Sequence, residues 1–472
     1  MDFKNDPNLT IAKIAPLIRR RKLSPLELTE FFLDRISRFN PSLNAFLTVT
    51  ADLARKQARQ AEKEIAAGKY RGPLHGIPIS LKDLFYTKGV RTTGGSKILR
   101  RFVPKENAFA VHRLFQAGAV LLGKTNLHEF AYGVTSINPH FGAVRNPWDL
   151  ERIAGGSSGG SAAAVSAGLC LASLGTDTGG SIRIPSAACG IVGLKPTRGL
   201  VPMDGVIPLA FSLDHAGPMC RSVRDAGLML NALINATPGI AIVNYLRDLR
   251  DGVRGLQIGL PKNYFFEGLQ REIRAGVLDA CRVLERLGAR IREVRLKGIE
   301  ETARLVAEIT VAEALAFHWN CLRRRPQDYG PDLRQRMEKS ANQPTVVYLQ
   351  AQEKRREITR TFAEVFEKVD ALVAPTLPVV APPLSEKEIR IARKKEPVRG
   401  ILLRFTRPGN LTGLPAITLP CGFSPEKMPI GMQLLGRSHD EAKLLRIAQA
   451  YEEATPWHEI FPPEKIAEAV RP

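Results

Sequence analysis

The stretch GTDTGGSIRIP, from Gly175 to Pro185, places two glycines directly before Ser181 and an isoleucine, an arginine and a proline directly after it. Glycines let a backbone turn tightly, so successive N–H groups of the segment TDTGGS can point at one acceptor. A serine nucleophile needs a base and a set of donors that stabilise the oxyanion formed on the attacked carbonyl. The stretch therefore makes Ser181 a candidate nucleophile in a tight turn that also supplies the donors.

A second run of glycines and serines, AGGSSGGSAAAVSAG, begins upstream at Ala154. A run of this kind, taken alone, is typical of a flexible linker. This one continues without interruption into small residues that suit a tightly packed helix, which favours a compact turn. Serines in such a turn, Ser157 among them, can present hydroxyl groups inside a site.

The base is harder to find. The eight histidines are dispersed, and neither a GxSxG nor an SxxK pattern surrounds Ser181 or Ser157. A histidine triad assembled from distant positions stays open. A lysine can serve if burial keeps it neutral, and Lys82 ends the strand-like apolar run of GPLHGIPISLKDLF. A lone lysine is normally a solvated surface residue, so Lys82 is only a candidate on these residues.

Helical and strand patterns alternate along the chain. SPLELTEFFLDRISRF opens with Ser24 as N-cap, Pro25 at the first helical position and Glu27 completing a capping box. Downstream, the helical REIRAGVLDACRVLERLG leads into the strand-like ARIREVRL, and ITRTFAEVFEKV leads into DALVAPTLP. These patterns predict one large α/β domain whose sheet is covered by helices on both faces. Residues 379–397, VVAPPLSEKEIRIARKKEP, are interpreted as a loop that forms a flap.

Composition narrows the class of protein. The chain has 472 residues, of which 44% are hydrophobic and 24% charged, as expected of a globular protein. The first ten residues lack the apolar core of a signal peptide, and no stretch reaches the roughly 18 apolar residues of a membrane helix, so we expect a cytoplasmic protein without a membrane partner. The six cysteines lack framework or CxxC spacing, which argues against disulfides and zinc.

The net charge is +21, from 68 basic and 47 acidic residues. A strongly basic chain can indicate a nucleic-acid partner. The basic runs RRRK (19–22), RRR (323–325) and RKK (393–395) lie far apart in the sequence, without interleaved aromatic residues. A solvated, arginine-rich surface is the favoured interpretation, and we expect no nucleic-acid partner.

Two further motif matches point to other chemistry. GAVLLGKT, from Gly118 to Thr125, satisfies the P-loop pattern and keeps a nucleotide-binding protein as a remote alternative. Its intervening apolar residues suit a buried strand better than a phosphate-binding turn, with Gly118 ending the preceding helix. HEFAY, from His128, has Tyr132 where the second histidine of a zinc-binding HExxH would stand.

Taken together, GPLHGIPISLKD, GGSSGGSAAAV and GTDTGGSIRIPSAACGIVGLKPT resemble the amidase signature family in order and spacing. Lys82 precedes Ser157 by 75 residues, and Ser157 precedes Ser181 by 24. AGAVLLGKTNLHEFAYG, LDHAGPMCRSV, GNLTGLPAITLPCGF and PIGMQLLG extend the resemblance over most of the chain. It implies one domain over residues 1–472, with an N-terminal helical segment at 8–48, a signature core at about 72–223 and a variable, closing part at 224–472.

The resemblance implies roles for the candidate residues. Ser181 would be the nucleophile, Ser157 the serine that relays protons after a cis peptide bond from Gly156, and Lys82 the base. The oxyanion hole would consist of the backbone N–H groups of four residues, Thr178, Gly179, Gly180 and Ser181. Asp177 and Arg183 are expected to support this loop. The implied fold is an α/β/α domain around a mixed, largely parallel sheet, and the implied reaction needs no metal or organic cofactor.

The substrate is open on sequence alone. The family includes stand-alone amidases, acylamide and carbamate hydrolases, and the glutamine-using subunit of an aminoacyl-tRNA amidotransferase. Leu402 and Leu403 stand where we expect the acid that binds glutamine's amino group in that tRNA-linked protein. We therefore expect a stand-alone hydrolase of small neutral amides, aryl amides or carbamates, and the tRNA-linked role is the alternative. A homodimer is left open.

Overall fold

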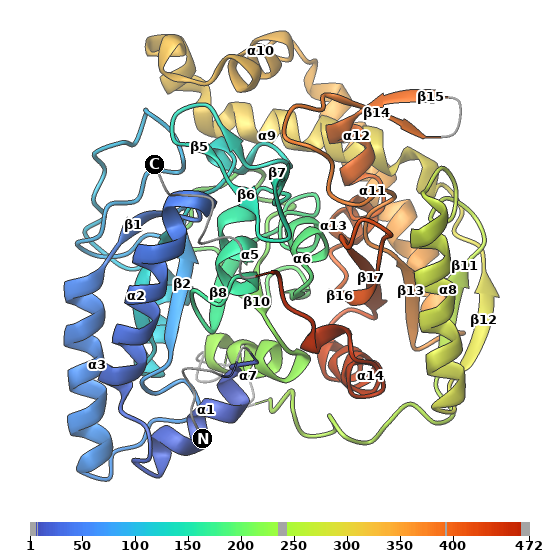
Figure 1. Ribbon diagram of the computed structural model, residues 1–472. Helices are drawn as coiled ribbons and strands as arrows, with labels where there is room; N and C mark the ends of the chain where they lie inside the picture. The colour runs from blue at the N-terminus through green and yellow to red at the C-terminus, as the bar shows by residue number, and fades with distance from the viewer. Residues whose placement is uncertain (1–5, 7, 235–242, 392–393, 464–472) are drawn as a thin grey trace.

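The computed structural model describes residues 6, 8–234, 243–391 and 394–463. Within them, 11 strands form one central sheet in the order β1-β3-β2-β8-β10-β9-β16-β17-β13-β11-β12, and helices surround it (Figure 1). The strands of this sheet are β1 (Phe46–Val49), β2 (Pro78–Lys82), β3 (Val120–Thr125), β8 (Ala172–Thr176), β9 (Val192–Lys195), β10 (Ala216–Cys220), β11 (Gln257–Pro261), β12 (Arg290–Val294), β13 (Ala371–Pro375), β16 (Ala416–Phe423) and β17 (Pro429–Gly436).

Short elements complete the architecture. Three two-stranded pairs are β4 (Ile137–Asn138) with β5 (Gly142–Ala143), β6 (Arg145–Asn146) with β7 (Asp149–Ile153), and β14 (Glu388–Ile391) with β15 (Lys394–Pro397) among the described residues. The α-helices are α1 (Ile11–Arg19), α2 (Pro25–Leu43), α3 (Ala51–Ala66), α4 (Phe109–Gln116), α5 (Gly159–Ser166), α6 (Arg183–Cys189), α7 (Val223–Ile234), α8 (Arg271–Arg286), α9 (Thr302–Arg324), α10 (Pro331–Lys339), α11 (Thr345–Phe366), α12 (Val398–Leu403), α13 (Arg407–Thr412) and α14 (Glu441–Glu453). Single 3₁₀ turns are η2 (Glu129–Ala131), η3 (Ile299–Glu301), η4 (Pro326–Asp328) and η5 (Trp457–Glu459).

The mixed sheet predicted from the sequence is confirmed. Parallel pairing occurs in two blocks, β3-β2-β8 and β13-β11-β12. The strands between these blocks, from β10 to β17, pair antiparallel with their neighbours. One cause is visible in the chain: β16 and β17 are joined by the short turn at 424–428, and a parallel pair would need a crossover of a dozen or more residues.

Helices cover both faces of the sheet, as predicted. Gly431 and Gly436 lie an odd number of positions apart on β17, so their Cβ positions point to opposite faces. A Cβ at Gly431 would lie 2.6 Å from the Cβ of Ala187 on α6, and one at Gly436 would lie 3.5 Å from the Cβ of Leu444 on α14. The two helices therefore sandwich β17, and a contiguous hydrophobic core fills both layers.

Several local predictions are confirmed. Ser24 caps α2, with its Oγ accepting a hydrogen bond from the backbone N–H of Glu27 at 3.1 Å. The helix α8 is followed by Gly288 at φ +97° and then by β12, and α11 leads into β13. The Gly/Ser run forms a compact turn that continues into the fully buried α5.

Two sequence interpretations are corrected. The interpretation of 379–397 as a loop was wrong for residues 388–391 and 394–397, where β14 and β15 pair antiparallel. The signal was the alternation in EIRI, since Ile391 is buried while Glu388 and Arg390 are exposed. The P-loop alternative was also wrong, because GAVLLGKT supplies the buried strand β3.

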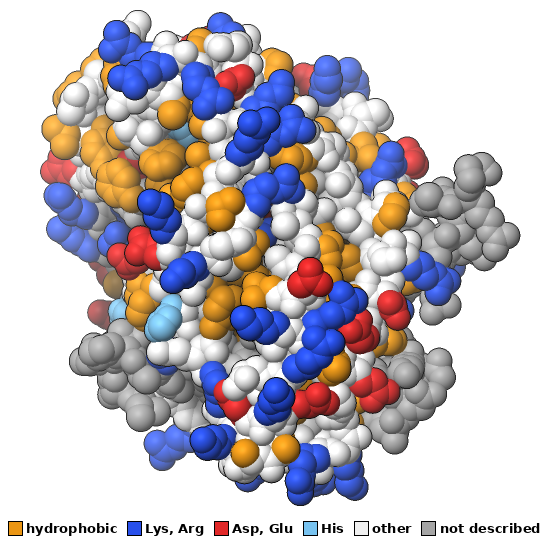
Figure 2. Space-filling view, turned by 90° about the vertical axis from the view of Figure 1, so that its left-hand side faces the viewer, with side chains coloured by type: hydrophobic (Ala, Val, Ile, Leu, Met, Phe, Trp, Pro, Cys, Tyr) orange, Lys and Arg blue, Asp and Glu red, His pale blue; other side chains and the backbone are white. Residues whose placement is uncertain are grey.

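The surface fits the dispersed charge expected from the sequence. On the face shown in Figure 2, lysine and arginine side chains are spread among acidic and apolar ones. Among the described residues, no helix is long and apolar enough to span a membrane.

Candidate active site

Lys82 lies at the end of β2, an interior strand between β3 and β8, and its side chain is fully buried. Its Nζ donates hydrogen bonds to Ser157 Oγ at 2.8 Å and to Thr176 Oγ1 at 2.7 Å. Burial lowers the pKa of Lys82 to about 7, because desolvation of the ammonium outweighs the opposing charges of Asp177 and Asp214. Lys82 is therefore a buried amine poised to exchange protons with a hydroxyl near neutral pH.

The neighbouring carboxylate, Asp83, points away from Lys82. Its Oδ2 accepts hydrogen bonds from the backbone N–H and the Oγ1 of Thr93, and its Oδ1 lies 3.5 Å from Lys124 Nζ. Successive residues of an extended segment face opposite sides, which is why Asp83 pairs with the lysine of β3 instead.

Ser157 lies in the turn before α5, and the peptide bond from Gly156 is cis, as the resemblance implied. The backbone N–H of Ser158 donates to the carbonyl of Ser181 at 3.2 Å, which joins the two serine-bearing segments. The start of α5 packs closely against the backbone of Asn126 because its second residue, Gly160, has no side chain. A Cβ at Gly160 would lie 2.4 Å from the carbonyl oxygen of Asn126. The structure thus brings Lys82, Ser157 and Ser181 into one region.

Ser181 follows the loop after β8 and lies two residues before the start of α6. In the described part of the chain, the four backbone N–H groups of residues 178–181 donate no hydrogen bond to the protein. Gly180 has φ +138°, and a Cβ there would lie 2.2 Å from Thr406 Oγ1, so only glycine fits this backbone. Thr406 Oγ1 in turn donates to the carbonyl of Gly179 at 2.6 Å. Thr406 thus holds the loop in place, and the backbone N–H groups of residues 178–181 are available to a ligand.

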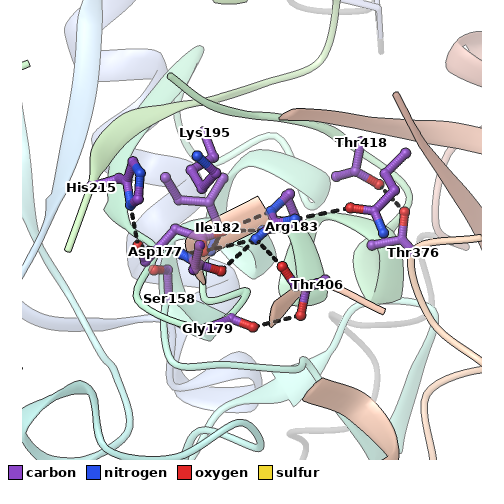
Figure 3. A network of polar contacts seen from close by, with 12 residues as sticks. Ser158, Asp177, Gly179, Ile182, Arg183, Lys195, His215, Thr376, Thr406 and Thr418 are labelled. Atoms are coloured by element: carbon purple, nitrogen blue, oxygen red, sulfur yellow. Dashed lines mark hydrogen bonds and ion pairs between the residues drawn. The ribbon is translucent and has the colours of Figure 1, made fainter. Parts of the chain in front are cut away.

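A buried ion pair supports this loop (Figure 3). Arg183 Nε lies 3.1 Å from Asp177 Oδ2, and that oxygen also accepts the backbone N–H of Ile182 at 3.1 Å. The Arg183 guanidinium holds the pKa of Asp177 well below its usual range despite burial. Arg183 further donates to the carbonyl of Thr406 at 2.8 Å and to Asn410 Oδ1 at 2.7 Å. The expected supporting role of Asp177 and Arg183 is confirmed.

Thr178 has a second anchor. Its Oγ1 donates to Asp214 Oδ1 at 2.5 Å, and the other oxygen of Asp214 accepts the backbone N–H groups of Leu209 and Ala210. Burial raises the pKa of Asp214 to about 6, although these hydrogen bonds favour its charged form. The side chain of Thr178 is thereby fixed beside the loop.

In the described structure, the histidine side chains do not take part in the hydrogen-bond contacts of the two serines. Within the described residues, neither Ser157 nor Ser181 has a hydrogen bond to a histidine side chain. Burial lowers the pKa of His128 to about 3, and its Nδ1 lies 3.4 Å from Thr135 Oγ1. The Nδ1 of His215 faces backbone carbonyls. Across the described parts of the chain, no group of three His, Cys, Asp or Glu residues is arranged to hold a metal ion.

A cavity of about 60 Å³ opens at Ser181. Thr178 and Gly179 line it on the loop side, and Leu403 on the side of α12. Arg399 and Arg407 also line it. Sequence reasoning missed both arginines and Thr176, because no local pattern says which distant side chains meet at the end of a strand.

The chain has relatives among known proteins. A family model described as Amidase matches residues 27–445. A glutamyl-tRNA(Gln) amidotransferase subunit of Roseiflexus sp. (strain RS-1) is 42% identical over 484 aligned positions, covering 96% of this chain and 98% of that protein. A solved structure of a vestigial protein complex related to an s-triazine catabolic enzyme is 36% identical with a TM-score of 0.90, covering 94% of this chain and 98% of that one.

A second solved structure is a bacterial aryl acylamidase of the amidase signature enzymes, 29% identical with a TM-score of 0.89, covering 98% of this chain and 99% of that one. The family model spans well over half of the chain, and the relatives match it nearly from end to end. The chain therefore belongs to the amidase signature family and is an amidohydrolase.

Proposed function

We propose that the protein is a stand-alone amidase in which Ser181 forms an acyl-enzyme, with Ser157 as proton relay and Lys82 as base. The observation that carries this proposal is the 2.8 Å hydrogen bond between Lys82 Nζ and Ser157 Oγ, made by a lysine with no solvent exposure. The free N–H groups of residues 178–181 would form the oxyanion hole. Nearby Asp177 and Asp214 are occupied in supporting the loop.

Burial gives Lys82 the protonation state that a base needs. A solvated lysine with a pKa of about 10.4 is neutral in roughly one molecule in a few thousand at pH 7. With a pKa of about 7, a large fraction of Lys82 is neutral at that pH. The neutral amine can take a proton from Ser157 as Ser157 takes one from Ser181.

The proposed reaction balances in two steps. Ser181 Oγ bonds to the amide carbonyl carbon, its proton passes through Ser157 to Lys82, and the backbone N–H groups stabilise the oxyanion. The carbon–nitrogen bond then breaks, and the departing amine takes a proton back through Ser157. Water repeats the sequence on the acyl-enzyme, which releases the carboxylic acid and restores Ser181.

The second candidate is the glutamine-using subunit of a tRNA amidotransferase, which the name of the Roseiflexus relative favours. Glutamine carries an α-ammonium group that requires an acidic partner. Among the described residues, no aspartate or glutamate lines the cavity at Ser181, and Leu403 occupies its wall. Glutamine's carboxylate would pair with Arg399 and Arg407, but its ammonium would lie beside these arginines without an acid among the described lining residues, which favours the stand-alone amidase.

The proposal is tested with the purified chain alone. It is incubated with aliphatic amides, aryl amides, carbamates and glutamine, and ammonia or amine release is measured. Hydroxylamine traps the acyl group, and mass spectrometry locates the adduct in quenched samples. We expect turnover without partner subunits, a hydroxamate product and an adduct on Ser181.

The matched control is Ser173→Ala. Ser173 is a buried serine on β8 whose hydroxyl donates to the backbone of Ser80 and does not line the cavity. It should retain the adduct, while Ser181→Ala should lose it. Turnover of glutamine alone, and only with added partner subunits, would instead establish the second candidate.

A further inference from the structure

The cavity at Ser181 has an unusual electrostatic lining. Its only charged lining residues, among those the structure describes, are Arg399 on α12 and Arg407 on α13. A third guanidinium, that of Arg336 on α10, lies close to Arg399: both carbon atoms Cζ stand over the ring of Tyr132, which also lines the cavity, at 4.8 Å for Arg336 and 5.2 Å for Arg399. The cavity therefore concentrates positive charge near the candidate nucleophile.

Neither cavity arginine has a hydrogen-bond acceptor among the described residues. Arg407 is only 9% exposed, and its Nε is buried without a hydrogen-bond partner in the described structure. The Nε of Arg399 is likewise buried and unpartnered there. Arg336 is paired in part: its Nη2 lies 2.9 Å from a carboxylate oxygen of Asp332 and its Nε donates to the carbonyl of Asp332 at 3.2 Å, while its Nη1 is buried without a hydrogen-bond partner in the described structure. Donors left unsatisfied in a cavity are costly to the free protein and are available to a ligand.

Arg183 is a buried arginine whose guanidinium has hydrogen-bond acceptors and an acidic partner, and it serves as a comparison. Arg183 is fully buried beside Asp177 and also donates to Thr406, Asn410 and Gln433. Arg407 has no such acid, and burial together with the charge of Arg399 lowers its pKa to about 10. It still carries its charge at neutral pH, so an anion in the cavity would be strongly favoured.

We propose that the substrate is a small amide that carries a carboxylate, which Arg407 and Arg399 bind in the cavity at Ser181. This inference rests on the proposed amidase function and narrows its substrate class. The planar guanidinium groups match a carboxylate in charge and geometry. Because Ser181 and both arginines line one cavity, the amide and the carboxylate would belong to one small molecule. Monoamides of dicarboxylic acids have this chemistry, whereas the neutral amides expected from the sequence leave both arginines unpaired.

The test compares glutaramate, a five-carbon chain with an amide at one end and a carboxylate at the other, with glutaramide, its neutral diamide of the same shape. We expect kcat/KM of the wild-type protein to be at least about tenfold higher for glutaramate. Glutamine, which adds an ammonium group to glutaramate, should be the poorer substrate because that group meets the arginines. No preference for glutaramate over glutaramide would overturn the inference.

Two variants assign the preference to the arginines. Arg407→Met should lower kcat/KM for glutaramate by about tenfold to a hundredfold, the usual range for losing a hydrogen bond to a charged group, and the glutaramate-to-glutaramide ratio should fall with it. Arg399→Gln should lower the ratio in the same direction. Arg390→Gln, at an exposed arginine on β14, is the matched control and should keep the wild-type ratio. Equal losses for both substrates would show that the arginines only shape the loop.

A binding measurement separates this inference from the proposed reaction. Calorimetry with glutaramate is run on Ser181→Ala and on the double variant Ser181→Ala with Arg407→Met. We expect glutaramate to bind the first and to bind the second about tenfold or more weakly, with glutaramide weak for both. If Ser181 proves not to be the nucleophile, this difference still decides the inference. Equal binding of glutaramate by both variants would overturn it, even where amide hydrolysis at Ser181 is established.

Discussion

Two fully buried lysines on neighbouring strands, Lys82 on β2 and Lys124 on β3, differ in what surrounds them. Within the described residues, Lys82 Nζ donates to two hydroxyl groups, those of Ser157 and Thr176. Lys124 donates to the carbonyl of Phe85 at 2.6 Å and to Thr92 Oγ1 at 2.8 Å, and lies 3.5 Å from a carboxylate oxygen of Asp83. Burial lowers the pKa of Lys82 to about 7 and that of Lys124 to about 8.

The difference between the lysines shows that burial alone does not make a catalytic base. Both amines are desolvated, but Asp83 offsets part of that effect at Lys124. More important is what each lysine contacts. Both lysines contact a hydroxyl that can accept and donate a proton. The Thr92 hydroxyl beside Lys124 donates to the carbonyl of Val90, whereas the Ser157 hydroxyl beside Lys82 lies in the segment that is joined to Ser181.

The largest expected effect separates the two lysines by activity. Lys82→Arg should lower kcat for amide hydrolysis by about a thousandfold or more, because a guanidinium stays protonated and cannot take the proton. Lys124→Arg changes the matched position on the next strand. Steady-state kinetics should show that it retains far more activity than Lys82→Arg. Near-normal turnover by Lys82→Arg would place the base elsewhere.

The second prediction separates the lysines by stability. Lys124→Met leaves Asp83 buried without its ion-pair partner, which should lower the free energy of unfolding by about 3–5 kcal/mol. Urea unfolding monitored by circular dichroism measures this change. Adding Asp83→Asn to Lys124→Met should restore part of the loss, since the remaining buried charge is then removed. A Lys124→Met variant as stable as the wild type would show that the ion pair is not what holds these strands.

The third prediction is that Lys82→Met is more stable than the wild type at pH 7, by about 1–3 kcal/mol after loss of two hydrogen bonds. The folded-state pKa of about 7 lies below the unfolded value of 10.5, so the unfolded chain binds the extra proton between these values. Wild-type stability should therefore rise with pH across this window, and the advantage of Lys82→Met should shrink. Unfolding midpoints between pH 7 and pH 9.5 test this. An advantage that does not change with pH would contradict the low folded-state pKa.

The smallest expected effect concerns Thr176, the second acceptor of Lys82. Thr176→Val removes a hydroxyl that accepts a 2.7 Å hydrogen bond and stabilises the ammonium form. The ionisation that controls kcat/KM should move to lower pH by about one unit or less. A pH–rate profile measures the shift. Movement to higher pH would mean that Thr176 favours the neutral amine.

Much of this site could be predicted because its parts are local in sequence. The glycines before Ser181, the turn before α5 and the strand that ends at Lys82 each have their own pattern, and the family resemblance supplies their order. The capping of α2 by Ser24 and the strand nature of GAVLLGKT were readable for the same reason.

The parts that escaped prediction depend on long-range packing. Three residues of the site that escaped prediction lie on elements far apart in the sequence. They are Thr176 on β8 and Arg407 and Asn410 on α13, and these elements meet because of the way the sheet is assembled. In the segment ILLRFTRP, an acid would have indicated a glutamine site. Its arginines were not predicted to line a cavity because isolated arginines are usually solvated. The antiparallel centre of the sheet likewise follows from how β9, β10, β16 and β17 pair, which the helix-to-strand patterns do not specify.

The central claim, that Lys82 acts as a neutral base, is tested most directly by the pH dependence of kcat/KM between pH 5 and pH 9.5. The wild-type value should rise through an ionisation near pH 7, because only the deprotonated amine can accept a proton and its pKa in the free protein is about 7. The residual activity of Lys82→Ala should lack this ionisation. The same acid limb persisting unchanged in Lys82→Ala would contradict the assignment.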